Sequence, residues 1–136
     1  MITIEELKAY IFNEIYTRLG EVSLEGIFFS YEDVYNFDGM YISAQDQEYS
    51  IVYTEKGKER ERISVKDKDE VLWYVLDSVS FNIAMEYAAK NREEGKDFRR
   101  VYFKKILEIY NLFGESFCSK KEKEIQRILK ENPYND

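Results

Sequence analysis

Cationic side chains gather in one stretch of a chain that is acidic overall. Lys96, Arg99, Arg100, Lys104 and Lys105 fall within ten positions, although the chain has 20 Lys and Arg against 27 Asp and Glu, a net charge of −7. The two arginines stand where a helix is predicted to begin. That end of a helix carries partial positive charge and disfavours further cations. The arginines therefore need carboxylate partners, within the chain or on another molecule.

A structural role is the first interpretation of these arginines. Asp97 is expected to cap the helix that follows and to offset its positive end. Glu86, Glu93 and Glu94 are the obvious partners at the end of the preceding helix, where a bidentate bond would fix the angle between the helices. A direct contact with an acidic partner is the alternative. The predicted structural brace comprises Glu86, Arg92, Asp97, Arg99 and Arg100.

Carboxylates are the remaining option for catalysis. The chain has no histidine and one cysteine, Cys118, which excludes Ser-His and Cys-His pairs, histidine-ligated zinc and a thiolate metal site. Glu32-Asp33 and Asp67-x-Asp69-Glu70 could act as acid–base pairs or bind a hard cation. The second group already suits the first turn of a helix and lacks the spacing of a calcium loop. We expect no catalytic residue, metal or cofactor, and a carboxylate-dependent hydrolase or metal-binding enzyme is the alternative.

Aromatic and acidic residues alternate between Ser30 and Glu48. Tyrosine is enriched at the energetic centres of protein interfaces, and neighbouring carboxylates would favour a basic partner. The alternative is that Phe37 and Tyr41 belong to the core and that the acids form turns. The predicted partner-binding residues are Tyr31, Glu32, Asp33, Tyr35, Asp38, Tyr41, Asp46 and Glu48.

A helix and four short strands are predicted for the first half of the chain. Apolar residues recur at helical spacing over residues 4–19, after a Thr3-x-x-Glu6 capping box and before Gly20. From Glu25 to Val65 the period changes to two, and turns are predicted at Asp38-Gly39, Asp46-Gln47 and Lys56-Gly57. The last strand begins with alternating Glu and Arg, which suits a solvated edge strand.

Three helices are predicted for the second half. The first follows a cap at Asp67, buries a stripe that includes Ile83 and Tyr87, and ends between Asn91 and Gly95. The second spans residues 98–113, and the third begins at the S-x-x-E box of Ser119 and ends near Glu131. The predicted fold is α+β, with an N-terminal helix, a four-stranded antiparallel meander and three C-terminal helices packed on the sheet, in one domain over residues 1–136.

Charge and hydropathy limit the classes of partner. A net charge of −7 opposes binding to nucleic acid and anionic membranes and favours basic proteins. The sequence has no run of 18 apolar residues and no basic region followed by an apolar stretch at its start, so we expect a cytoplasmic protein. We expect a monomer or weak dimer, with a self-associating scaffold as a further alternative.

Three segments resemble the immunity protein 63 family of bacterial polymorphic toxin systems. They are ISVKDKDEVLWYVLDSVSFNIAMEYAAKNREEGKDFRRVYFKKILEIYNLFG, EIQRILKENPYND and YTEKGKERERISV, which lie in the C-terminal two-thirds of the chain. The most specific elements are Trp73 in D-E-V-L-W-Y, the run N-R-x-x-G-x-D-F-R-R that ends at Arg100, and I-L-x-x-N-P-Y-x-D. Glu55-Lys56-Gly57 replaces the glutamate-arginine-glycine turn associated with the family.

The resemblance implies a function but no catalytic residues. Such a protein would bind a cognate polymorphic or contact-dependent toxin in the cytoplasm and block it by occluding its active site. A basic nuclease is one toxin that an acidic partner would suit. The shared motifs can belong to a common scaffold, while the surface that recognises the toxin lies elsewhere.

Overall fold

The computed structural model describes residues 2–30 and 35–136, which form two compact units. The first unit ends at Leu76 and the second covers Asp77–Asp136, so the division falls inside helix α2 (Lys68–Lys90). The prediction of one domain stays a prediction. None of the helices in the described part of the chain is long and apolar enough to cross a membrane.

Helix α1 (Ile4–Leu19) opens the first unit and has the bounds that its sequence predicts. The Thr3 side chain accepts the Glu6 N–H at 3.2 Å, and the Glu6 carboxylate accepts the Thr3 N–H at 3.3 Å, which confirms the capping box. Leu7, Ile11 and Ile15 are fully buried. The helix therefore contributes one apolar stripe to the core of this unit.

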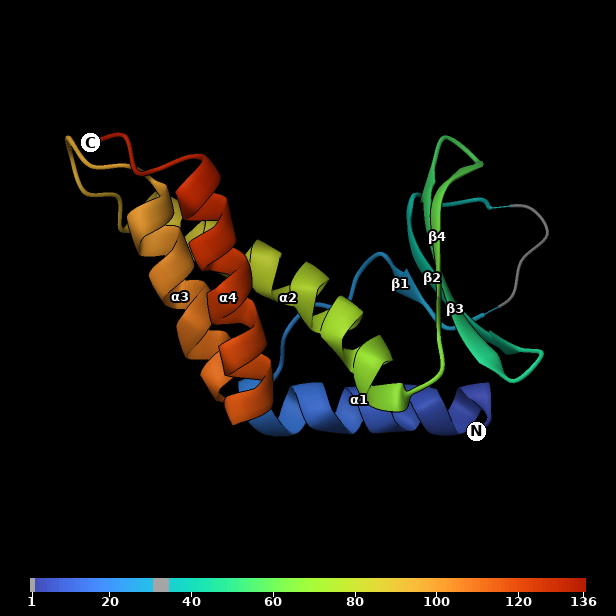
Figure 1. Cartoon of the computed structure of the whole chain (residues 1–136). Coiled ribbons are helices and arrows are strands. Elements are labelled where there is room, and N and C mark those ends of the chain that lie inside the picture. The colour runs from blue at the N-terminus through green and yellow to red at the C-terminus, as the bar shows by residue number, and fades with distance from the viewer. Residues whose placement is uncertain (1, 31–34) are drawn as a thin grey trace. The chain divides into compact units, whose positions relative to one another are not determined.

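Four strands follow and form one sheet in the order β1-β2-β3-β4. Figure 1 shows this sheet, seen nearly edge-on. The strands are β1 (Ile27–Phe28), β2 (Gly39–Gln45), β3 (Glu48–Glu55) and β4 (Lys58–Val65). The turns at Asp46-Gln47 and Lys56-Gly57 are confirmed, and all four residues have positive φ, between 50° and 76°. Two consecutive positive φ values twist a two-residue turn to match its strands.

The first strand pair corrects the predicted meander, because β1 runs parallel to β2. Gly39 begins β2, so the predicted Asp38-Gly39 turn between antiparallel strands is wrong. The Met40 N–H donates to the Gly26 carbonyl at 2.7 Å, which brings the start of β1 and the start of β2 together beside Gly39. A Cβ on Gly39 would lie 2.2 Å from the Gly26 oxygen, so the glycine is required by this close approach.

Both faces of the central strands are largely buried, while β4 is an exposed edge. On one face Ile42 and Ile51 are fully buried, and the Tyr49 hydroxyl accepts the Ile2 N–H at 3.0 Å beside the start of α1. The opposite face carries Tyr41 and Val52 among small hydroxyl residues. The predicted solvated character of β4 is confirmed, since six of its eight residues are exposed.

The second unit contains the rest of α2 with α3 (Arg99–Asn111) and α4 (Glu115–Glu131), and Figure 1 shows α3 and α4 side by side. The predicted start of α4 at Ser119 is wrong, because Gly114 with φ 101° separates the helices and the Cys118 N–H already donates to its carbonyl. Tyr87, expected inward, is 41% exposed. The α+β class, with an N-terminal helix, a four-stranded sheet and three C-terminal helices, is confirmed.

Candidate partner-binding surface

Four aromatic rings form a cluster on the face of the sheet opposite Tyr49. We define the aromatic cluster as Phe28, Tyr35, Phe37 and Tyr41. The Phe28 ring stacks on Tyr41 at 4.8 Å and on Phe37 at 5.8 Å, while Tyr35 meets Tyr41 edge-on at 4.8 Å. Tyr41 is buried, but Phe37 is 64% exposed. The cluster therefore presents one large apolar ring on a base of packed rings.

The backbone beneath Phe37 is fixed by hydrogen bonds. The Thr54 hydroxyl donates to the Phe37 carbonyl at 3.0 Å, and the Tyr41 hydroxyl contacts the Phe37 N–H and carbonyl at 3.4 Å. The Asp38 carboxylate accepts the Lys56 N–H at 2.8 Å, which ties this segment to the β3–β4 turn. Because this backbone is fixed, the Phe37 segment would lose little conformational freedom on binding a partner.

An ion pair extends this face onto β4. Tyr41 pairs in register with Val52, and Val52 with Arg62, so the three residues form one row across the sheet. The Arg62 guanidinium donates two bonds to Glu59, at 2.7 and 3.0 Å. These bonds lower the pKa of Glu59 and raise the pKa of Arg62, to which Tyr35 adds a smaller contribution. The guanidinium is thus compensated locally.

The predicted partner-binding residues that the structure describes do not form one patch. Tyr31, Glu32 and Asp33 lie outside the described residues. Tyr35, Asp38 and Tyr41 lie at the aromatic cluster. Asp46 and Glu48 lie at the β2–β3 hairpin. The start of β2, beside the aromatic cluster, is six residues from this hairpin and therefore about 20 Å away.

The alternative that treated these residues as core and turn formers holds for Tyr41, Asp38 and Asp46, the last of which forms the β2–β3 turn. Tyr41 is buried, and the Asp38 carboxylate supports a turn. It is wrong for Phe37, which is the most exposed of the large apolar residues in the described part of the chain. Alternation alone could not separate Phe37 from a core residue, because Phe37 lies before β2, where no strand period applies.

Negative charge is concentrated in the first unit. Residues 1–76 contain 16 Asp and Glu against 8 Lys and Arg, whereas residues 77–136 contain 11 against 12. The net charges are −8 and +1, which together give the −7 of the chain. A basic partner would therefore be attracted to the unit that carries the aromatic cluster.

The acidic group at the start of α2 has structural contacts. The Asp67 carboxylate accepts the Asp69 N–H at 2.6 Å, and the Tyr10 hydroxyl donates to Asp69. Burial, followed by this hydrogen bond, raises the pKa of Tyr10. In the described residues no three His, Cys, Asp or Glu side chains are placed to hold a metal ion. The group thus joins α2 to α1 within the first unit.

Arg99 and Arg100 bind the last residues of the chain. The Arg99 guanidinium contacts Asp97 at 2.8 Å and donates to the carbonyls of Asn132 and Pro133 at 2.8 and 2.9 Å. Arg100 contacts Asp136 at 2.7 Å and lies 4.1 Å from the Tyr134 ring centroid. We define the C-terminal brace as Asp97, Arg99, Arg100 and residues 132–136.

The brace differs from its predicted form in its partners. Glu86 contacts Lys90 at 2.9 Å instead of an arginine of α3, and Arg92 lies exposed after α2. The N-cap of α3 is Phe98 and not the predicted Asp97, whose carboxylate accepts the Arg99 N–H at 2.9 Å from two residues before the helix. The spacing of the arginines gave no signal for Asp136, because that contact depends on the path of the chain after Pro133.

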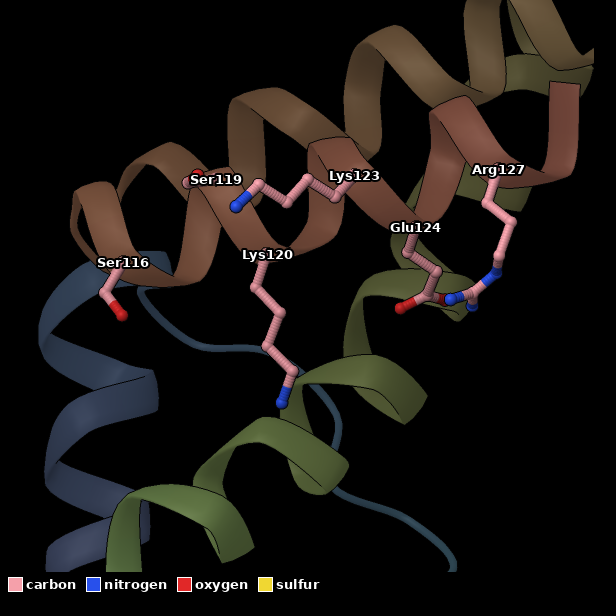
Figure 2. Close-up of a pocket in the computed structure, with 6 residues that line it drawn as sticks. All are labelled: Ser116, Ser119, Lys120, Lys123, Glu124 and Arg127. Carbon is pink, nitrogen blue, oxygen red and sulfur yellow. The ribbon is translucent and has the colours of Figure 1, made fainter. Parts of the chain in front are cut away.

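A shallow depression of about 480 Å³ lies along α4, and Figure 2 shows the six side chains that line it. In this view the Glu124 carboxylate and the Arg127 guanidinium lie close together, while Lys123 extends along the helix toward Ser119. All six residues come from this one helix and carry both signs of charge. The depression is therefore a less defined candidate than the aromatic cluster.

A comparison with protein-family models found a match to this chain. The family model for immunity protein 63 matches residues 45–127, more than half of the chain. The match contains β3, β4, α2 and α3, whereas every residue of the aromatic cluster precedes it. Comparisons with curated proteins and with solved structures found no match. The chain belongs to the immunity protein 63 family, whose membership points to a role in a toxin system with a toxin as partner.

Proposed function

We propose that this protein binds the toxin encoded by the adjacent gene and neutralises it by covering the toxin's active site. It acts by binding, without catalysis, in the cytoplasm of the producing or sibling cell. The observation that carries the proposed surface is the Phe37 ring, 64% exposed on a backbone held by Thr54, Tyr41 and Asp38. Rigid aromatic anchors of this kind contribute disproportionately to binding free energy.

Charge favours a basic toxin, such as a nuclease with a cationic active site. The first unit carries −8 and the aromatic cluster, so long-range attraction would bring a basic partner to the unit that holds the anchor. Such steering raises association rates and discriminates against acidic proteins more than it adds to affinity. The family model matches a region beyond the cluster, which suits a common scaffold with a partner-specific face.

Replacing Phe37 with alanine tests the surface. We expect Phe37→Ala to weaken binding of the toxin by about 2 kcal/mol, roughly 30-fold in dissociation constant, because the substitution removes the anchor ring. Phe81→Ala is the matched control, since Phe81 is 51% exposed in the second unit. Calorimetric titration of toxin with each variant measures the effect, and growth of cells that co-express toxin and variant measures protection.

The two parts of the proposal fail in different ways. If the unaltered protein neither binds nor protects against any toxin encoded beside it, the function itself is wrong. If it protects, but Phe81→Ala weakens binding and Phe37→Ala does not, the function holds and the assignment of the surface is wrong.

A further inference from the structure

The first turn of α3 lacks the local groups that usually stabilise the start of a helix. Its N-cap residue, Phe98, makes no side-chain hydrogen bond, and the first turn contains no acidic residue. Arg99 and Arg100 occupy that turn, at the positive end of the helix dipole. The N–H groups of a first turn have no partner within their own helix and need one from outside it. The start of α3 therefore depends on residues beyond the helix.

The tail, which we define as residues 132–136, supplies much of what is missing. The Asp136 carboxylate accepts the Asp97 N–H at 2.7 Å and contacts the Arg100 guanidinium at 2.7 Å. In return the Asp97 carboxylate accepts the Asn135 N–H at 2.8 Å. These two bonds are reciprocal, as in a capping box, although the partners are 39 and 38 residues apart in the chain. The tail thus acts on α3 as a cap from a distant part of the sequence.

The tail lies on the surface of the second unit, beside the turn that precedes α3 (Figure 1). Four of its five residues are exposed, and Tyr134 is half-buried. The centroid of the Tyr134 ring lies 4.1 Å from the guanidinium carbon of Arg100 and 5.5 Å from that of Arg99. The tail is therefore held by polar and ring–cation contacts, and no residue of it enters the core. A segment held in this way can leave while the helices stay packed, because few buried apolar contacts are lost.

We propose that the tail is a latch that controls the first turn of α3. With the tail docked, the carboxylates of Asp97 and Asp136 compensate the two arginines, and the helix begins at Arg99. With the tail released, the Asp97 N–H and the Arg100 guanidinium lose their carboxylate, and the first turn opens as far as the buried Phe103. This device lies in the second unit and does not depend on the proposed contact between the aromatic cluster and a toxin.

Amide hydrogen exchange of the full chain tests the latch, because four backbone N–H groups report on its two parts. Those of Asp97 and Asn135 donate across the contact between the tail and the turn before α3. Those of Arg100 and Tyr102 donate to carbonyls of that turn and form only when the first turn of the helix forms. We expect the four amides to open together, with similar protection factors.

Two substitutions should release the latch while leaving the sequence of α3 intact. We expect Asp136→Asn to speed the exchange of the four amides by about tenfold, because it weakens a charge-assisted contact. Tyr134→Leu keeps every carboxylate and should speed the exchange of the same amides, because it removes the ring from Arg100. Glu131→Gln is the matched control, since it removes an exposed negative charge from the end of α4, and it should leave the four amides unchanged.

Three results would overturn this proposal. Faster exchange of Asp97 and Asn135 alone would show that the first turn of α3 is stable without the tail. Equally faster exchange at Leu112 and Phe113, whose N–H groups donate at the other end of α3, would show that the tail supports the whole helix and not one turn. No change in either variant would show that these contacts do not hold the tail. Because no toxin is present, none of these results depends on the function proposed above.

Discussion

Lys121 is a charged residue that α4 places in the interior of the second unit. It is 5% exposed, and its ammonium contacts Asp77 at 2.9 Å and Glu124 at 3.1 Å. It also lies 4.8 Å from the centroid of the Tyr110 ring, whose hydroxyl donates to Asp77. Burial is the main cause that raises the pKa of Tyr110, and nearby Asp77 adds to it.

The two members of this ion pair should respond unequally to substitution. Asp77 is 54% exposed at its side chain, so Lys121→Met leaves a carboxylate that water can solvate and should cost less than about 1 kcal/mol. Asp77→Asn leaves a buried ammonium with a weaker partner and should cost about 2 kcal/mol. Urea unfolding of both variants measures the difference. A larger loss of stability for Lys121→Met would contradict the account.

Gly39 is the residue on which the approach of β1 to β2 depends. We expect Gly39→Ala to lower the free energy of unfolding by about 1–3 kcal/mol more than Gly95→Ala, because the added Cβ would meet the Gly26 carbonyl. Gly95 is the matched control, since it has positive φ but open space around it. Equal effects of the two substitutions in chemical denaturation would show that conformation, and not the contact, sets the cost.

At the scale of elements, the sequence predicted correctly those features that depend on residues close together in the chain, such as helix caps and hairpin turns. The capping box fixed the start of α1, and the dipeptides at Asp46 and Lys56 gave two hairpin turns. The direction of β1 was missed, because a two-residue strand has too little pattern to show its partner. The start of α4 was missed because the S-x-x-E box lies inside a helix that Gly114 had already separated from α3.

The C-terminal brace is an element whose stability should depend on pH. Hydrogen bonds from Arg100 lower the pKa of Asp136 to about 2, and those from Arg99 lower the pKa of Asp97. Both carboxyls bind protons less readily in the folded chain than in the unfolded one. Their stabilising contribution is therefore complete above their ordinary pKa of 3.8 and is lost as the pH falls toward 2.

Substituting Arg100 tests the origin of this shift. We expect the side-chain carboxyl of Asp136 to titrate near pH 2 in the unaltered protein. In Arg100→Gln its pKa should rise toward the ordinary value. Arg60→Gln removes an exposed guanidinium from the β4 edge and should not affect it. Carbon-detected NMR titration of the Asp136 side-chain carboxyl measures its pKa in both variants. An unchanged midpoint in Arg100→Gln would show that the ion pair does not lower the pKa of Asp136.

At the scale of the molecule, the sequence was sufficient to predict the α+β class, and its resemblance to a family agrees with the match over residues 45–127. It was not sufficient to define a binding surface. Composition gave a net charge of −7, but only the division into units places all of that excess before Asp77. Asp46 and Glu48 seemed to belong with Asp38 because they are near in sequence, and β2 separates them.

The central claim is that the first unit covers the toxin through the aromatic cluster. Amide hydrogen exchange of the protein with and without its toxin tests this most directly, because protection maps the contact along the chain. We predict new protection around Phe37 to Tyr41 and in the adjoining β3–β4 turn. Formation of a complex with protection confined to residues 77–136, and none at the cluster, would contradict the claim.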